Sequence, residues 1–420
     1  MSPLKSCDNS YYFSGPEHSE RDHWIGRGAQ QLQLTGPVDQ DHLDGFFAGR
    51  DVRGSNLLTQ ARLGKHRTNL GYDCVFSAPK SVSLVALAGP TELAREAHRA
   101  HRTAVTRALE FFDSQISQVR RQGSTKTTYI DSIGIVGAGF EHAVTRSLDP
   151  HLHSHVVFAN LTRGSDGLWS SFNSAFIWAS ARTTGYLYQA NLRHELTKTL
   201  GVGWAPVKNG VSDISGIPRG VIESFSTRSQ QIQARLHERS ADISTANRYS
   251  MKRFAALSSR DDKPVDFDLR GLSTLWQERL ETLGVELNGD SNLFHRSQVP
   301  EVSNRLDVEL TSAIVSSRAM ARSPFGLYRH TVNTACELIK PGSDPGQIVQ
   351  IAREVVESPI IRRERKNLGL SNYLAASNGS LEKSRSTLNR SRDLVYSRTN
   401  LKDPFLGAVK SRDLIPSRSL

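Results

Sequence analysis

Two histidines spaced two residues apart place the tightest constraint on how this chain can fold. His153 and His155 precede residues 156–158, Val-Val-Phe, which favour β-strands. Side chains at positions i and i+2 of a strand point to the same face of the sheet. The stretch therefore predicts a strand that presents two imidazoles side by side, as a metal site requires.

A third histidine is expected to reach this pair through a hairpin. Residues 133–140 are predicted to form a strand that leads into His142, and the polar segment 145–150 is predicted to be a turn. An antiparallel hairpin would place His142 beside His153 and His155. Three neutral nitrogens with open coordination positions suit a catalytic divalent ion better than a closed structural one.

The pattern leaves alternatives open for this histidine cluster. The histidines could alternate on an exposed edge strand without binding an ion. His151 is in phase with the pair, but it follows Pro150 at the turn, so it is a second-choice ligand. The 3 cysteines lie far apart in the sequence, which argues against thiolate ligands.

The charge of the chain favours a polyanionic partner. A net charge of +11 points most simply to nucleic acid, and no apolar run approaches the length of a membrane span. Residues 361–420 contain 13 Lys and Arg against 5 Asp and Glu. This end could be a nonspecific phosphate-binding arm or a solvated, disordered tail, and both interpretations stay open.

Hydrophobic periodicity predicts a mixture of strands and helices. Strands are expected at 71–78, 127–135 and 152–161. Helices are expected at 37–49, 79–87, 91–119, 174–200, 221–239, 245–258, 270–283 and 306–356, the last broken at Pro341-Gly342. The expected organisation is a first domain over 1–290, a linker over 291–305, a helical accessory segment over 306–375 and a basic, disordered tail over 376–420.

Several motifs, specific in combination although not singly, follow one another along the chain. They are Tyr11-Tyr12, Trp24-x-Gly26-x-Gly28-Ala29, Gly71-Tyr72-Asp73, Phe76-Ser77-Ala78-Pro79-Lys80-Ser81-Val82-Ser83, His142 and Leu152-His153-x-His155. In this combination the chain resembles the MobF conjugative relaxases of the TrwC type, which belong to the histidine-hydrophobe-histidine (HUH) endonuclease superfamily. The resemblance covers roughly residues 8–290. It implies an α+β fold in which helices flank a central antiparallel sheet that carries the histidines.

The resemblance also implies an activity: metal-dependent, strand-specific nicking of transfer-origin DNA in the bacterial cytoplasm. A tyrosine would attack the phosphodiester, leaving a 5′-phosphotyrosine link and a free 3′ hydroxyl, and the reverse step would rejoin the strand after transfer. Tyr11 or Tyr12 is the expected nucleophile, since the chain shows only one of the two tyrosine pairs that many members carry. Asp73 is the expected proton acceptor or partner of a ligating imidazole. One divalent ion, Mg, Mn or Zn, is expected on the three histidines.

The remaining expectations concern contacts with partners. Lys80 is a candidate phosphate contact or a solvated loop lysine, and Arg146 could bind DNA phosphate or pair with Asp149. Because no G-x-x-x-x-G-K-[ST] P-loop occurs, we expect no helicase activity and a separate helicase. Accessory DNA-binding proteins and a type IV secretion coupling protein are further expected partners, without membrane insertion.

Two other functions stay open at this point. One is a catalytically impaired relaxase-like module that only binds single-stranded or supercoiled origin DNA. The other is a three-histidine oxygenase or hydrolase that acts on a small molecule. The basic charge and the lack of a carboxylate-rich pocket speak against that second alternative.

Overall fold

The computed structural model describes most of the chain. The described residues are 1–5, 10–13, 22–51, 53–57, 69–123, 127–227, 230–231, 267–289, 292–295 and 306–370. They belong, apart from 230 and 231, to one compact unit made of Met1–Arg228 and Asp261–Leu374. A second unit comprises Ser229–Arg260 and Ala375–Leu420. The helix expected at 245–258, most of the one expected at 221–239 and the expected tail therefore lie outside the described residues.

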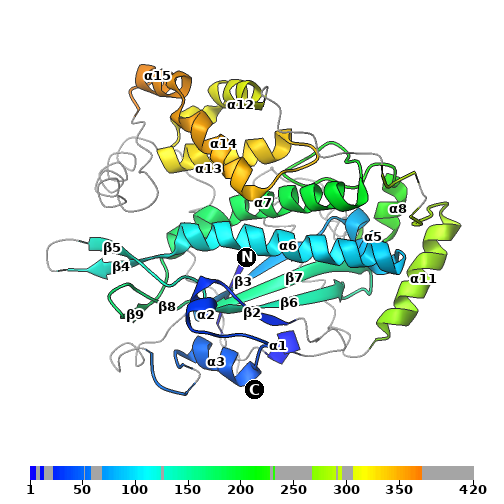
Figure 1. The fold of residues 1–420 in the computed structure, drawn as a ribbon, viewed down its shortest axis with the longest axis horizontal. Coiled ribbons are helices and arrows are strands. Elements are labelled where there is room, and N and C mark those ends of the chain that lie inside the picture. Colours follow the sequence, from blue (N-terminus) through cyan, green and yellow to red (C-terminus); the bar gives the residue numbers. More distant parts are fainter. Residues whose placement is uncertain are drawn as a thin grey trace, which may run out of the picture. The chain divides into compact units, whose positions relative to one another are not determined.

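A five-stranded antiparallel sheet forms the centre of the first unit (Figure 1). Its strands, in spatial order, are β1 (Ser2–Leu4), β3 (Gly71–Ser77), β7 (Pro150–Ala159), β6 (Gly137–Val144) and β2 (His23–Ile25). β6 and β7 form the hairpin that the sequence predicts, and its register pairs His142 with His153. The α+β class and the central antiparallel sheet are confirmed.

One face of this sheet packs against helices α5 (Lys80–Ala88), α6 (Thr91–Ile116) and α7 (Ser174–Leu200). β7 contributes every second residue to the shared core, including Leu152, Val156 and Phe158. α6 contributes a row of small side chains at helical spacing, namely Ala97, Ala100, Ala104 and Ala108. Small side chains let the helix approach the sheet closely, which brings its polar residues within reach of the strands.

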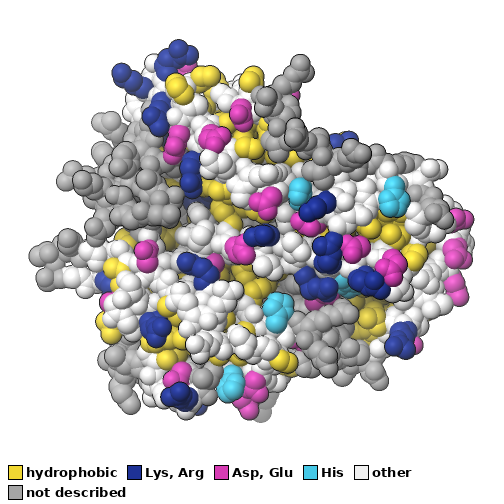
Figure 2. Space-filling view, in the orientation of Figure 1, with side chains coloured by type: hydrophobic (Ala, Val, Ile, Leu, Met, Phe, Trp, Pro, Cys, Tyr) yellow, Lys and Arg dark blue, Asp and Glu magenta, His cyan; other side chains and the backbone are white. Residues whose placement is uncertain are grey.

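The solvent side of α6 carries paired charges. Arg95 pairs with Glu92, and two further i,i+3 pairs join Arg99 to Glu96 and Arg107 to Glu110. Figure 2 shows Lys and Arg side chains interspersed with Asp and Glu on this side of the molecule. Such interspersed charges stabilise an exposed helix by a few tenths of a kcal/mol per pair, about 0.2–0.5, and do not form a strongly basic surface.

The opposite face of the sheet carries a smaller core that includes the short helix α1 (Ser10–Phe13) and helix α3 (Gln40–Ala48). Here the alternate residues of the hairpin, Phe140 of β6 and Val157 of β7, meet Phe46 and Phe47. The histidines belong to this same face, because they are in phase with Phe140 and Val157. Helix α2 (Arg27–Gln31) follows β2.

Several predicted boundaries are wrong. The strand expected over 127–135 ends at Asp131 (β5, Thr127–Asp131) and pairs with β4 (Gln118–Gln122). The helix expected to run to residue 119 ends at Ile116, because β4 begins at Gln118. The strand leading to His142 starts only at Gly137. The interruption has a physical cause: Asp113 of α6 accepts a hydrogen bond from the Ile135 N–H, next to Gly134 at φ 95°.

The remaining elements before the C-terminal helices include a second two-stranded ribbon and two helices. β8 (Thr162–Arg163) pairs with β9 (Trp169–Ser170), and α8 (Arg219–Ser224) and α11 (Leu269–Thr282) complete the core around α5. The helix predicted at 270–283 is thus confirmed within one residue. Among the described residues, no helix is long and apolar enough to cross a membrane.

The C-terminal helices follow a gap in the described chain. They are α12 (Leu306–Val315), the 3₁₀ turn η1 (Arg318–Ala321), α13 (Pro324–Leu338), α14 (Pro345–Glu357) and α15 (Pro359–Asn367). The break expected at Pro341-Gly342 separates α13 from α14. These helices share a core with Phe111 of α6 and with Tyr186, Leu187 and Ala190 of α7.

Candidate metal and nucleic-acid site

Three imidazoles converge on the face of the hairpin opposite α6. His142 comes from β6, whereas His153 and His155 come from β7. The ring centroids of His142 lie 5.4 Å from His153 and 5.1 Å from His155, and the latter two are 5.3 Å apart. One ring nitrogen of each lies within 4.8 Å of the others. The hairpin therefore brings together the three predicted ligands.

Hydrogen bonds fix the tautomers of two of these rings. Nδ1 of His155 lies 2.9 and 3.0 Å from the two carboxylate oxygens of Asp73 on β3, and Nδ1 of His153 lies 2.7 Å from the carbonyl oxygen of His151. Carboxylate and carbonyl oxygens only accept, so each Nδ1 carries a proton, and in the neutral form of each ring the lone pair is on Nε2. This donor set fits a divalent ion that prefers imidazole nitrogen.

Burial favours the neutral form of two imidazoles in this region, those of His151 and His153. Desolvation, together with the neighbouring imidazoles His151 and His155, lowers the pKa of His153 well below its usual range. Desolvation and the charge of Lys80 lower the pKa of His151 to about 4. Neutral imidazoles are the form that binds metal, so protons do not compete with an ion for His153 near pH 7.

His151 lies beside the cluster. Its ring stacks on His153 at 4.7 Å, but the nitrogens that converge among the described residues are those of His142, His153 and His155. The carbonyl oxygen of His151 orients His153, as described above. A backbone contact of this kind does not depend on the side chain at position 151.

The tyrosine pair lies in α1, against the same face of the sheet. The ring of Tyr12 is 7% exposed, stacks on Phe140 at 5.3 Å and lies 5.4 Å from the ring of His155. The backbone of Tyr11 is helical, whereas its side chain lies outside what the structure describes. Packing of Tyr12 therefore places its ring beside the histidine cluster.

Lys80 is the first residue of α5 and is partly buried. Its Nζ donates a hydrogen bond to the carbonyl oxygen of Pro150 at 2.6 Å, where β7 begins. Burial lowers the pKa of Lys80 to about 8, although the carboxylates of Asp149 and Asp213 oppose the shift. Lys80 thus lies at the end of the hairpin from which His151 projects.

The turn between β6 and β7 holds the other predicted DNA contact. Arg146 lies in this turn and is partly exposed. Asp149, which is buried at the end of the turn, accepts a hydrogen bond from Oγ1 of Thr227 at 3.0 Å. The turn therefore joins the segment after α8 to the hairpin that carries the histidines.

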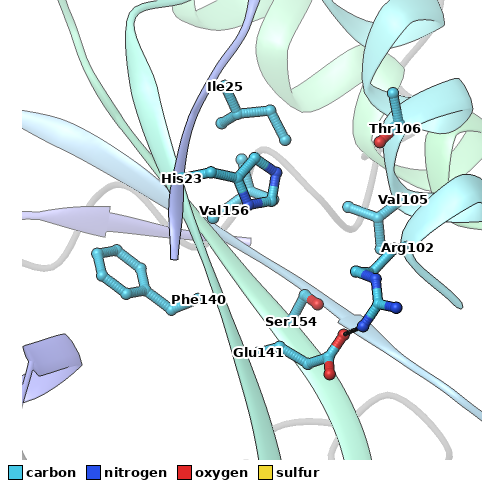
Figure 3. Close-up of a pocket in the computed structure, with 10 residues that line it drawn as sticks. His23, Ile25, Arg102, Val105, Thr106, Phe140, Glu141, Ser154 and Val156 are labelled. Carbon is cyan, nitrogen blue, oxygen red and sulfur yellow. Dashed lines mark ion pairs between the residues drawn. The ribbon is translucent and has the colours of Figure 1, made fainter. Parts of the chain in front are cut away.

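Sequence reasoning missed a set of polar residues behind the histidines. Ser154 and Glu141 alternate with the histidines and point toward α6, where His98, His101 and Arg102 lie. Figure 3 shows the lining of a small pocket on this side, with Glu141 and Arg102 facing one another and Ser154 close by. The sequence did contain one signal for this. Alternate residues of a strand face opposite sides, so Ser154 must lie on the buried face if His153 and His155 lie on the other.

Comparison with known proteins identifies conjugation proteins among the relatives of this chain. A sequence model described as TrwC relaxase matches residues 3–283. Two curated proteins from Escherichia coli, both described as multifunctional conjugation protein TraI, are 31% identical over 327 residues and, for strain K12, 32% identical over 290 residues. The alignments cover 74% and 66% of this chain but only 17% and 15% of those relatives. The chain thus spans less than a fifth of their length.

Solved structures of a conjugative relaxase share this architecture. TrwC in complex with oriT DNA, in metal-free and metal-bound forms, is 32% identical with a TM-score of 0.61. Each comparison covers 68% of this chain and 99% of the solved one. A copper-bound complex of TrwC with oriT DNA is 33% identical with a TM-score of 0.59, covering 66% of this chain and 94% of the other.

Proposed function

The chain belongs to the TrwC relaxase family, and from this premise we propose that it nicks and rejoins one strand of transfer-origin DNA during conjugation. The observation that carries the proposal is the convergence of His142, His153 and His155, with Asp73 bonded to one of them. The DNA-bound relaxase structures that resemble the chain support the choice of substrate. We place the activity in the bacterial cytoplasm.

The reaction we propose is a transesterification at phosphorus. The phenolic oxygen of a tyrosine forms a bond to the scissile phosphorus while the bond from phosphorus to the 3′ oxygen breaks. The tyrosine loses its proton, the departing 3′ oxygen gains one, and the 5′ phosphate stays on the protein. One phosphodiester is exchanged for another, so the same residues can run the step in reverse and rejoin the strand.

The residues of the hairpin prepare the phosphate for attack. A divalent ion held by His142, His153 and His155 would supply electrostatic stabilisation of the charge that develops on the phosphate oxygens. Asp73 holds His155 in the tautomer whose Nε2 carries the lone pair, and we assign it this orienting role. The metal-bound TrwC structures support a divalent ion, and we propose Mg, Mn or Zn for this chain.

We assign the nucleophile to the pair Tyr11-Tyr12. The ring contacts of Tyr12 with Phe140 and His155 support a position of the pair beside the histidines. A buried, stacked ring is also a good anchor, so Tyr12 can hold α1 in place while Tyr11 reacts. Separate phenylalanine substitutions distinguish these two roles.

Contacts with DNA phosphate are proposed for Lys80 and Arg146, which flank the hairpin at its turn end. A lysine with a pKa near 8 is still largely charged at neutral pH, and a bound phosphate would favour the charged form further. Arg146 can supply a second positive charge from the turn. Together they would position the strand without reading its sequence.

We propose that residues 1–290 form the nicking and joining domain. Residues 291–305 would act as a linker, 306–375 as a helical accessory segment and 376–420 as a basic tail. Unwinding of the transferred strand would come from a separate helicase. Accessory DNA-binding proteins and a type IV secretion coupling protein are proposed as further partners.

The proposal is tested by trapping the covalent intermediate. Purified full-length protein is incubated with Mn²⁺ and a single-stranded oligonucleotide that spans the cognate transfer origin, and products are separated under denaturing conditions. We expect a protein–DNA adduct that disappears in the Tyr11→Phe, Tyr12→Phe double variant while DNA affinity is retained. Mass spectrometry of the DNA-linked peptide then identifies the attacking tyrosine.

A binding-only module is the competing function. The single tyrosine pair in the first 30 residues favours it, because many relatives carry two pairs. Tight origin binding without any adduct, in the presence of Mn²⁺, would support this module and contradict the nicking proposal.

A further inference from the structure

The helix-covered side of the hairpin carries a polar network directly behind the three histidines. Ser154 lies between His153 and His155 in β7, and Glu141 precedes His142 in β6. Ser154 and Glu141 are directly paired across the two strands. Their neighbours in the register are the pairs His142–His153 and Phe140–His155, so the network lies at the centre of the ligand pattern.

The Ser154 end of this network is a chain of short hydrogen bonds through a buried histidine. Nε2 of His101 lies 2.8 Å from Oγ of Ser154, and its Nδ1 lies 2.8 Å from Oη of Tyr188 on α7. His101 is 0% exposed, and its desolvation lowers its pKa to about 4. A neutral ring donates through one nitrogen and accepts through the other, so both contacts are satisfied at once.

The Glu141 end is held by two further residues of the same helix. Oε1 of Glu141 lies 2.8 Å from Nδ1 of His98, and Oε2 lies 3.5 Å from Nη1 of Arg102. Figure 3 shows the carboxylate and the guanidinium meeting beside Ser154. His101 and Arg102 follow His98 by three and four residues, so each of them lies on the same side of α6 as His98.

Apolar packing alone would hold the hairpin to α6. The core on this face already contains Leu152, Val156 and the alanine row of α6. Buried polar groups add desolvation costs, and the hydrogen bonds that satisfy Ser154, His101 and Tyr188 specify one arrangement more sharply than apolar contacts do. The contact between Glu141 and Arg102 is an ion pair and not a hydrogen bond. Ser154 and Glu141 occupy the strand positions that alternate with those of the histidines.

We propose that His98, His101 and Arg102 of α6, with Tyr188 of α7, form a clamp that positions the metal-binding histidines by fixing Ser154 and Glu141 from behind. The members of this clamp are positioning residues, since they act through the strands. The inference rests on the proposed binding of a divalent ion by the three histidines. Loosening the clamp should leave the fold intact but should make the ligand geometry less preorganised, which weakens the binding of an ion.

Removal of a single hydroxyl tests the clamp. Mn²⁺ binding to the full-length protein without DNA is measured by isothermal titration for the wild type, Ser154→Ala and Tyr188→Phe. We expect the dissociation constant to rise about tenfold for Ser154→Ala, at the low end of outer-shell effects, and less for Tyr188→Phe. Ser154→Thr keeps a hydroxyl at this position and should bind Mn²⁺ nearly as the wild type does.

Thr331→Val is the matched control. Thr331 is also fully buried and donates its hydroxyl to a backbone carbonyl, that of Leu327, but it lies in α13. Its loss should lower the melting temperature as Ser154→Ala does while Mn²⁺ affinity stays within about twofold, well below the outer-shell range. Equal Mn²⁺ affinity in the wild type, Ser154→Ala and Tyr188→Phe would overturn the clamp and leave the metal site standing. A wild type that binds no Mn²⁺ would overturn the proposed metal site and the clamp with it.

Discussion

Two buried polar side chains, His101 of α6 and Arg193 of α7, attach different regions of the molecule to the same pair of helices. Both are nearly inaccessible, at 0% and 1% exposure. His101 contacts Ser154, which lies between two candidate metal ligands. Arg193 donates hydrogen bonds to three backbone carbonyls, those of Lys340, Gly210 and Cys336, at 3.0, 2.7 and 2.6 Å.

The difference lies in what each contact determines. The contact of His101 with Ser154 sets the position of hairpin groups that can take part in chemistry. Contacts to the carbonyls of Cys336 and Lys340, at the end of α13, set where the C-terminal helices dock on α7. Those carbonyls lie beyond the range 3–283 that matches the TrwC relaxase family. We therefore expect changes in the hairpin to alter function more than stability, and changes around Arg193 to do the reverse.

The largest expected effect is the loss of nicking in His153→Ala. Removing one of the three proposed ligands should abolish several kcal/mol of charge stabilisation, so the nicking rate should fall about a thousandfold or more. Origin DNA affinity, measured by fluorescence anisotropy, should change by less than about tenfold because phosphate contacts supply most of it.

His151→Ala is the matched control in the same strand. His151 stacks on His153, but its contribution to the site is its backbone carbonyl, which alanine retains. The nicking rate should fall far less than in His153→Ala. Equal losses in the two variants would contradict the ligand assignment.

Asp73→Asn should produce the next largest effect on chemistry. An amide oxygen can accept from Nδ1 of His155, but it lacks the charge that raises the basicity of the ring. Metal affinity and nicking should fall about 10- to 100-fold, as is typical for outer-shell partners. Asp166→Asn removes a carboxylate that pairs with Arg121 near β9, and it should leave both quantities unchanged.

The sequence predicted the hairpin because its geometry follows from local rules. Strand alternation places His153 and His155 on one face, and a short turn places His142 opposite His153. The prediction of His142 as the third candidate ligand therefore needed no knowledge of distant contacts. The helix expected at 174–200 from hydrophobic periodicity coincides with α7. In the structure its ends are set by adjacent residues, since Asn173 caps its start and Gly201 ends it in the left-handed conformation.

The parts that escaped prediction depend on contacts distant in sequence. β6 begins at Gly137 rather than residue 133 because Asp113, from α6, takes the N–H of Ile135. His101 and Arg193 look like ordinary polar residues of long helices, and only the packed structure shows that both are buried. Hydrophobic periodicity predicts which face of a helix is buried from its apolar residues. It does not show which polar residues are buried among them.

Arg193→Ala should show the opposite behaviour to the hairpin variants. Three buried carbonyls would lose their donor, at about 1 kcal/mol each, so the free energy of unfolding should fall by about 3 kcal/mol in urea titrations. Mn²⁺ affinity should remain that of the wild type. Arg219→Ala removes an exposed arginine that pairs with Glu223 within α8, and it should cost less than about 0.5 kcal/mol.

A fall in Mn²⁺ affinity for Arg193→Ala as large as that for Ser154→Ala would break the contrast between the two regions. It would mean that docking of the C-terminal helices also determines the ligand geometry. The shared core of α7 with α13 and α14 would then have to transmit this effect to the sheet.

The smallest expected effect concerns the pH dependence of stability. It distinguishes His101, which can gain a proton, from Arg193, which stays charged. Burial lowers the pKa of His101 to about 4 from its ordinary value of 6.5. Between these two values the unfolded chain binds a proton that the folded chain excludes, so stability rises with pH in this window and is lost as the pH falls. One such group contributes a slope of up to about 1.4 kcal/mol per pH unit.

His101→Phe should remove this contribution from the metal-free protein. Urea unfolding between pH 4.5 and 6.5, at about half-unit steps chosen to resolve one proton, should give a shallower slope for the variant than for the wild type. Thr331→Val, which removes a buried group that does not titrate, should lower stability at every pH without changing the slope. An unchanged slope in His101→Phe would mean that His101 is not the neutral link between Tyr188 and Ser154 that the clamp requires. The contrast with the permanently charged Arg193 would then lose its basis.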